Sequence, residues 1–284
     1  MTTSYVSTGA AMWKRFRRNR LALVGLLIVG VLALAAAAAP VLAPADPARQ
    51  VLEDKRTLPG GKYWLGADEF GRDIASRLIY GSRVALAVGV VSVLIALALG
   101  TLLGTVAGYL GGPVDETIMR ALDVLLAFPY LLLAIAIVSA LGPGLANTIL
   151  AVGIWATPGF ARVVRGSVLS VKEQEYVAAA RAIGASTARI VARHVLPNCI
   201  SILIVYSALY MASAILLEAA LSFLGLGVQP PTPSWGLMVS TGRDALVIAP
   251  HIATFPGLAI AFAVLGFNLL GDGLRDARDP KLTA

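Results

Sequence analysis

The sequence has few of the residues from which proteins build disulfides, metal centres and catalytic sites. Cys199 is the only cysteine, so no disulfide can form within the chain, and the only histidines are His194 and His251, too few for a multi-histidine metal site. Gly60-Gly61-Lys62 is followed by tyrosine and lacks the upstream glycine of a phosphate-binding loop, so we do not expect this chain to bind ATP. Neither a His-Glu-x-x-His pair nor a Gly-x-Ser-x-Gly elbow is present, which argues against hydrolytic catalysis.

Charged residues are also scarce. Only 14% of the 284 residues are charged, against roughly 25% in soluble domains, while 58% are hydrophobic and the mean hydropathy is +0.80. This composition is typical of a membrane protein. The net charge of +7 would suggest nucleic acid in a soluble protein, but basic residues beside membrane helices set topology and meet anionic lipid, so no nucleic-acid partner is expected.

Six apolar stretches approach the roughly 20 residues needed to cross a hydrocarbon core about 30 Å thick. The first could be read as a secretory signal, but its uninterrupted length exceeds a signal core, so we interpret it as an uncleaved helix. Pro129, Pro158 and Pro256 are expected to kink or end helices in this set. The predicted spans are Leu21–Ala43, Val84–Leu110, Ala121–Leu141, Leu145–Phe160, Cys199–Phe223 and Ile252–Gly271.

These spans predict one all-α integral membrane domain with both termini cytoplasmic. The expected segments are a cytoplasmic N-terminal segment (1–20), a first transmembrane helix (21–43), an extracytoplasmic loop (44–83) and a five-helix core (84–284) with a cytoplasmic loop at 161–198. In this orientation 15 of the 23 Lys and Arg residues face the cytoplasm, as the positive-inside rule prefers.

Gly100, Gly104 and Gly108 recur at every fourth position of the second span and therefore share one helix face. Such a face lets another helix approach closely. We interpret it as a helix interface, in the translocation path or between subunits; the alternative is scattered glycine facing lipid.

The cytoplasmic loop predicts a short helix, Ser170–Ile183. Ser170 and Glu173 have capping-box spacing, and Gly184 is a good C-terminal stop. Tyr176, Ala179 or Ala180, and Ile183 form a narrow apolar stripe that suits a groove on a partner; the alternative is an amphipathic helix lying on the membrane. A second helix is expected at Thr187–Val195, stopped by Leu196-Pro197.

This loop resembles the "EAA" loop of permease subunits in ABC-type importers, whose pattern is Glu-Ala-Ala, three residues, Gly, nine residues, then Ile-x-Leu-Pro. Ala179, Ala180, Gly184, Leu196 and Pro197 match in register. Ala178 stands where the family has glutamate and His194 where it has isoleucine, so one polar contact to the ATPase is missing. The resemblance implies that Glu175, Tyr176, Ala179, Ala180, Ile183 and Gly184 couple the chain to an ATPase.

Further segments resemble the peptide and nickel importer permeases. They are 65–83 (LGADEFGRD to SRLIYGSR), Arg120 to Asp123 with Ala127-Phe128-Pro129, and 218–236 (EAALSFLGLG to QPPTPSWG). The lone N-terminal helix and long first loop are similar to the C-type partner of the dipeptide, oligopeptide and nickel branch. The resemblance implies six transmembrane helices in a type I ABC importer permease fold with short cytoplasmic coupling helices.

The polar residues within the apolar stretches allow alternative interpretations. Glu218 either lines the path or joins two permeases, or it is a carboxylate near the helix end reached by interfacial water. Arg120 and Asp123 are expected to pair with each other. Tyr109, Tyr206, Tyr210 and Trp155 are interfacial anchors or pore lining. Trp235 touches a substrate-delivering protein or packs against its own domain.

The sequence therefore predicts a permease subunit of an ATP-driven importer of peptides or a related small solute in the bacterial inner membrane. The expected partners are a sister permease, two ATPase subunits or one fused ATPase that bind ATP and Mg²⁺, an extracytoplasmic substrate-binding protein, and lipid. No cofactor, metal or catalytic residue is expected in this chain. The alternative is an ion-coupled secondary transporter, which needs intramembrane acids; only Glu218 and Asp123 qualify. A membrane enzyme would need clustered acids, bases or metal ligands.

Overall fold

The computed structural model describes Trp13 and residues 15–278, and its regular structure is helical throughout this part. Most of the predicted segment 1–20 (residues 1–12 and 14), and residues 279–284, lie outside the described residues. The helices are α2 (Arg20–Ala37), α3 (Ala39–Leu42), α4 (Ile74–Leu110), α5 (Gly112–Leu126), α6 (Tyr130–Leu141), α7 (Leu145–Lys172), α8 (Glu175–Ala182), α9 (Thr187–Ile190), α10 (Leu196–Phe223), α11 (Trp235–Gly242) and α12 (His251–Arg278). Short 3-10 turns cover Leu52–Asp54 and Arg243–Ala245, and a π-helical turn covers Val191–Val195.

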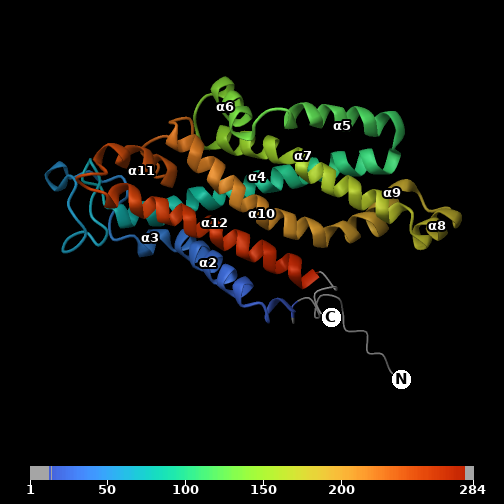
Figure 1. Ribbon diagram of the computed structural model, residues 1–284, viewed down its shortest axis with the longest axis horizontal. Coiled ribbons are helices and arrows are strands. Elements are labelled where there is room, and N and C mark those ends of the chain that lie inside the picture. The colour runs from blue at the N-terminus through green and yellow to red at the C-terminus, as the bar shows by residue number, and fades with distance from the viewer. Residues whose placement is uncertain (1–12, 14, 279–284) are drawn as a thin grey trace.

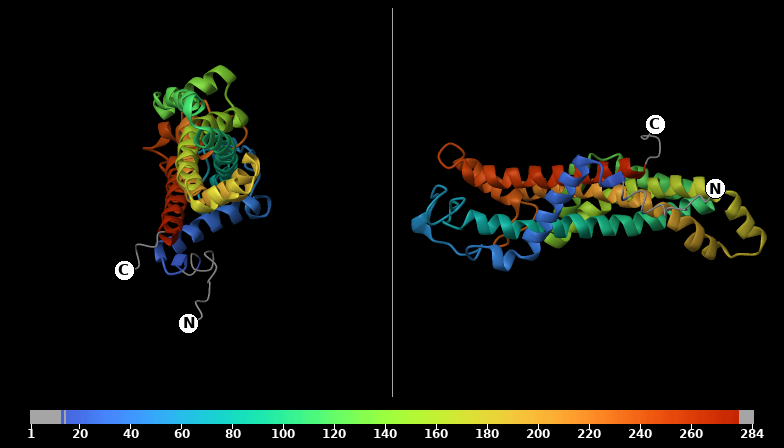
Figure 2. Two further views of the ribbon diagram at one scale, coloured as in Figure 1. Left: turned by 90° about the vertical axis from the view of Figure 1, so that its right-hand side faces the viewer. Right: turned by 90° about the horizontal axis from the view of Figure 1, so that it is seen from below.

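The long helices run roughly along one axis of an elongated bundle (Figure 1). α8 and α9 lie at one end, on the right of the view, while α11 and the loop before α4 lie at the other. α2 starts, and α12 ends, on the side that faces α8, but near the middle of the view. Seen from the α8 end, α5 and α6 occupy one edge of the bundle and α2 the opposite edge (Figure 2). Successive long helices therefore alternate in direction.

Four helical segments are long and apolar enough to cross a membrane: α2, α4, the continuous run Thr187–Phe223, and α12. The pair α5 and α6 makes a fifth if the two helices count as one span, although they are bent by 90°. α7 falls short of this measure because Arg162, Arg165 and Lys172 follow its apolar half. The described part of the chain is therefore all-helical, with four to five apolar spans.

Two predicted spans differ from the observed helices for identifiable reasons. α4 begins ten residues before the predicted Val84, because the Asp73 carboxylate caps it by accepting from the Ser76 backbone N–H at 2.7 Å. The predicted span Ala121–Leu141 is divided at Pro129, as expected of that residue: proline disfavours the helical conformation in the residue before it, so α5 ends at Leu126 and α6 starts at Tyr130.

Small residues allow α2 to lie directly on α12. A Cβ on Gly25 would stand 2.6 Å from the Leu270 backbone nitrogen, and one on Gly273 would stand 2.2 Å from the Ala22 Cβ. Asn19 caps α2 through its side-chain oxygen, which accepts from the Leu21 N–H at 3.0 Å. The first span is thus fixed to the last by close backbone packing.

Polar contacts fix the loop before α4, residues 44–73. Asp68 is buried and accepts from the Arg72 Nε at 2.6 Å and from the Arg72 backbone N–H at 3.0 Å. Nearby, Lys62 and the Tyr63 hydroxyl both donate to Asp54. The Lys62 ammonium, with the Tyr63 hydroxyl, lowers the pKa of the Asp54 carboxyl, so this tie persists at neutral pH.

Candidate functional site

α8 is a short helix at one end of the bundle, with well-defined ends. It begins after Gln174, with Glu175 in its first turn. It ends at Gly184, whose φ of +83° is a left-handed conformation that glycine adopts freely. The Ala185 N–H donates to the Ala180 carbonyl at 3.1 Å and the Gly184 N–H to the Arg181 carbonyl at 3.0 Å, which is the Schellman pattern of a helix terminus.

The predicted start of this helix is wrong. Ser170 lies inside α7, which continues to Lys172, and Glu173 terminates α7 rather than capping a new helix. The capping-box spacing failed because Ser170 was already part of a longer helix. The helix in this loop is therefore Glu175–Ala182, separated from α7 by the two residues Glu173 and Gln174.

The two faces of α8 differ in exposure. Tyr176, Ala179 and Ile183 are exposed, and Ile183 has 86% of its surface open to solvent. Val177 and Ala180 are buried against the chain itself. Ala180, predicted as an ATPase contact, instead faces inward, so Ala179 is the small residue at the centre of the exposed stripe.

The buried face of α8 joins a continuous apolar core. Val177 and Ala180 pack in one cluster with residues of α7 and α10, including Val164, Phe160 and Leu203. Because close-packed interiors transmit strain rather than absorb it, a displacement of α8 would be passed to α7 and α10. α8 thus has one face exposed and the other packed on α7 and α10.

The helix that follows α8 runs without interruption into α10. Ser186 caps α9, accepting from the Arg189 N–H at 3.4 Å, and the π-helical turn Val191–Val195 then leads into α10 without a stop. The prediction that Leu196-Pro197 ends a helix is therefore wrong. Pro197 occupies the first turn of α10, where its missing N–H is tolerated.

The glycine face of α4 packs against α7 of the same chain. A Cβ on Gly100 would stand 2.4 Å from the Phe160 Cβ, and one on Gly104 would stand 2.3 Å from the Ala161 carbonyl oxygen. A Cβ on Gly108 would stand 3.0 Å from the Val168 Cβ. These glycines serve a helix interface within the chain, so they are not available to a sister subunit or to a translocation path.

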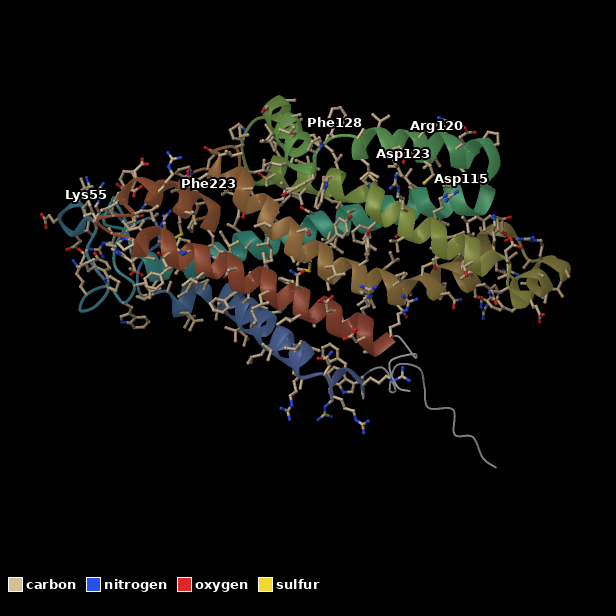
Figure 3. All side chains as sticks on the ribbon, viewed as in Figure 1. Lys55, Asp115, Arg120, Asp123, Phe128 and Phe223 are labelled. Atoms are coloured by element: carbon tan, nitrogen blue, oxygen red, sulfur yellow. The ribbon has the colours of Figure 1, made fainter. Side chains whose placement is uncertain are left out.

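Two ion pairs link α5 to α7. Arg165 donates two bonds of 2.6 Å to the Asp115 carboxylate, and Arg162 donates one of 2.6 Å to Asp123. The predicted pair of Arg120 with Asp123 is wrong, because Arg120 bonds Glu116 one turn back at 2.6 Å. Figure 3 shows Asp115, Arg120 and Asp123 spaced along α5. Sequence reasoning missed these pairs, which join residues 39 and 50 positions apart.

Glu218 is held inside this chain. It is 1% exposed, and its Oε1 accepts from the Ser222 hydroxyl at 2.7 Å and the Ser234 hydroxyl at 2.9 Å. The Ser222 oxygen also accepts from the Val228 N–H at 3.1 Å. The carboxylate thus ties the loop after α10 to the helix end, and the prediction that it lines the path or joins two permeases is wrong.

Trp235 is also an internal residue. It is 4% exposed, its indole N–H donates to the Leu78 carbonyl at 3.0 Å, and its ring covers Gly81. The predicted contact with a substrate-delivering protein is therefore wrong, and the packing alternative is correct. Over the described residues, no group of three His, Cys, Asp or Glu side chains is arranged to hold a metal ion.

Comparison with known proteins identifies the class of this bundle. A sequence model described as the binding-protein-dependent transport system inner membrane component matches residues 100–284, which is more than half of the chain. The chain belongs to this family. A second model, described as the N-terminal TM domain of oligopeptide transport permease C, matches residues 7–59 of the permease.

Individual relatives agree with the family. The permease is 48% identical over 271 residues to the glutathione transport system permease protein GsiD of Pectobacterium atrosepticum, covering 95% of this chain and 90% of that one. It is 50% identical to the GsiD protein of Escherichia coli O6:K15:H31, covering 95% and 89%. A solved chain of the MetNI methionine ABC transporter, titled as inward facing, matches with a TM-score of 0.59 and 19% identity, covering 71% of this chain and 96% of that chain.

These matches confirm the predicted resemblance and, of the predicted fold class, the all-helical ABC importer permease fold. The protein is a multi-pass inner-membrane permease of an ABC importer, with the helical fold of such permeases, and it is a transport subunit rather than an enzyme.

Proposed function

We propose that this chain is one of two unlike permeases in an ATP-driven importer of short peptides or a related small solute. The names of its relatives, which transport glutathione, and the N-terminal match to oligopeptide transport permease C support this cargo class. The sister permease would complete a translocation path that this chain lines on one side.

Six membrane crossings fit the arrangement of the helices. α2, α4, α10 and α12 each have the apolar length for one crossing, the bent pair of α5 and α6 would provide another, and α7 the sixth. The second half of α7, which carries Arg162, Arg165 and Lys172, points toward the α8 end (Figure 1). This alternation supports the proposal that α2 starts, and α12 ends, on the side where α8 lies.

The α8 end is proposed to be cytoplasmic. Fifteen of the 23 Lys and Arg residues fall in the segments assigned to that end, including the run before α2 and the residues from Arg162 to Arg193. Cytoplasmic loops carry such an excess.

The exposed stripe of Tyr176, Ala179 and Ile183 is the single observation that carries the coupling mechanism. It presents apolar side chains to the cytoplasm while Val177 and Ala180 fix the same helix to the core. A groove on a partner ATPase would cover the stripe, and ATP and Mg²⁺ would be bound entirely by that partner, as two subunits or one fused protein. Moving a two-state permease from 1:99 to 99:1 needs about 5.5 kcal/mol of differential binding, which demands a rigid connection.

A binding protein would dock at the opposite end. The loop between Arg243–Ala245 and α12 exposes three consecutive apolar side chains there, Leu246, Val247 and Ile248. They replace Trp235 as the proposed contact. The α5–α6 edge, which exposes Val124, Phe128 and Leu132, would face the sister permease.

Reconstitution of the complete complex in proteoliposomes tests this proposal. ATP-dependent uptake of glutathione and of dialanine delivered by the loaded binding protein is expected, and Ala179→Glu should abolish it. Ala178→Glu, also exposed but turned about 100° around the helix, restores the residue expected from the family pattern and should transport normally. Absence of peptide uptake by the unaltered complex would refute the cargo, and normal uptake by Ala179→Glu would refute the docking face.

A further inference from the structure

Five aromatic rings from three helices form a continuous stripe, hereafter the aromatic stripe. The Tyr130 ring of α6 lies 5.7 Å from Trp155 of α7, which lies 5.5 Å from Tyr210 of α10. The Tyr210 centroid is 4.9 Å from Tyr206 and 5.1 Å from Phe160. The spacings fall in the range of favourable aromatic pairs. Phe160 is fully buried, so the surface of the stripe is formed by the other four rings, each of which is at least partly exposed.

The aromatic stripe lies at the middle of the bundle's apolar layer. Residues 84–110 of α4 carry no charge, and Leu97 is at the centre of that run. α7 lies beside α4 with Gly153 against Ile95 and Phe160 against Gly100. Trp155 and Phe160 therefore sit near the level of Leu97, whereas tryptophan and tyrosine that anchor a protein in lipid are enriched at the two interfaces.

The polar atoms of the stripe do not suit a lipid environment. Tyr130 is 50% exposed, and Trp155, Tyr206 and Tyr210 are partly exposed. The phenol oxygens of Tyr210 and Tyr206 converge over Gly159, where a Cβ would stand 2.2 Å and 3.3 Å from them. Hydroxyl groups are costly in hydrocarbon unless they find partners or water.

The opposite edge of the bundle shows what a lipid-facing surface looks like in this chain. The exposed large hydrophobic side chains of α2 are leucine and valine only, such as Leu27, Val31 and Leu34. α6 and α7, which carry three of the five rings, lie on the opposite side of the bundle from α2 (Figure 2). The two edges differ in chemistry, as expected if only one of them meets lipid.

We infer that the aromatic stripe is this chain's part of the translocation path and the surface along which a peptide slides. This rests on the proposed function. A peptide presents an ammonium end and planar amide groups, both of which bind aromatic faces weakly. The stripe itself contains no charged side chain, so it cannot trap a peptide by its charge. Conduction needs binding that is favourable enough to admit a substrate and weak enough to release it.

The stripe is also mechanically linked to α8. Phe160 belongs to the same buried cluster as Val177 and Ala180, and Tyr206, Tyr210 and Trp155 pack against that cluster. A movement of α8 would therefore re-space the rings, alternately holding and releasing the peptide.

Water access to the stripe can be tested in the complete reconstituted complex with single cysteines. Cys199→Ser provides a cysteine-free background; the native thiol donates to the Ser167 hydroxyl at 3.2 Å, a bond that serine can keep. Tyr130→Cys and Trp155→Cys are then compared with Phe262→Cys, a matched aromatic position exposed on α12. The probe is a charged, membrane-impermeant methanethiosulfonate reagent, which reacts with the thiolate.

We expect the two stripe cysteines to react at least about 10-fold faster than Phe262→Cys, because one unit of thiol pKa between water and an apolar environment changes the thiolate fraction tenfold. In the same liposomes, Trp155→Ala should lower glutathione uptake per ATP hydrolysed about fivefold, while Phe262→Ala should not. Equal labelling rates at the three positions would overturn the inference even when the unaltered complex transports peptide. If the stripe cysteines react fast but the unaltered complex takes up no peptide, the stripe lines a water-filled path, and the inference that this path carries peptides is overturned.

Discussion

Shortening Ile183 to alanine should weaken ATPase docking without disturbing this chain. Ile183 ends α8, is 86% exposed and packs against little of its own protein. Ile183→Ala removes three carbon groups, each contributing about 0.8 kcal/mol when buried. If docking covers the exposed fraction, the loss is about 2 kcal/mol, and each 1.4 kcal/mol is tenfold in affinity. The dissociation constant of the ATPase should therefore rise about 30-fold.

The measurement is direct binding of the purified ATPase to the permease pair in lipid nanodiscs. Val41→Ala is the matched control, because Val41 is 87% exposed but lies in α3, at the far end of the bundle. Both variants should unfold thermally at the same temperature as the unaltered protein. An affinity within about threefold of the unaltered value for Ile183→Ala would refute the reasoning, and so would an equal loss for Val41→Ala.

Three further predictions concern contacts inside the chain, each read from thermal unfolding of the detergent-solubilised protein. Gly104→Leu should destabilise it by at least about 1–3 kcal/mol, because its Cβ would stand 2.3 Å from an α7 carbonyl oxygen, whereas Gly166→Ala, with no atom within 4 Å, should be nearly neutral. Glu218→Ala should cost more than Glu218→Gln, because only alanine leaves two buried serine hydroxyls without their acceptor, at about 1–3 kcal/mol for each unsatisfied group. Trp235→Phe should cost about 1 kcal/mol, since the ring still covers Gly81 but the 3.0 Å bond from the indole to a backbone carbonyl is lost.

Specific outcomes would contradict these three. Equal stability of Gly104→Leu and Gly166→Ala would show that α4 and α7 can separate without cost. Identical behaviour of alanine and glutamine at position 218 would mean that the serine hydroxyls find other acceptors. If the Trp235→Phe variant keeps full stability but no longer binds the loaded binding protein, Trp235 contacts the binding protein after all.

Several features followed from the sequence because they depend on local chemistry. The apolar block Cys199–Phe223 became the spanning part of α10, which begins only three residues earlier, since hydropathy over such a length is sufficient to predict a span. Gly184 stops α8 because a φ of +83° suits glycine irrespective of the surroundings. The loop motif alone is enough to indicate the family.

The errors concern residues whose partners are distant in the chain. The sequence around Glu218 does not indicate that Ser234 donates a hydrogen bond to it. The sequence around Asp123 does not indicate that it pairs with Arg162 rather than with Arg120, which is closer in the chain. The same holds for Trp235, whose acceptor lies 157 residues away. Spacing along one helix predicts which residues of that helix are neighbours, but it does not predict the neighbours that other helices contribute.

The sequence by itself determined that this chain is a membrane permease, where its main apolar helices run and which segment carries the coupling motif, because length, hydropathy and backbone preference act over a few turns. Only the tertiary structure decided that Ala179 is exposed and Ala180 buried, that the α5–α6 span is broken by 90°, and that five aromatic rings meet at mid-depth. Those outcomes depend on which helices pack together, and packing is a property of the whole bundle.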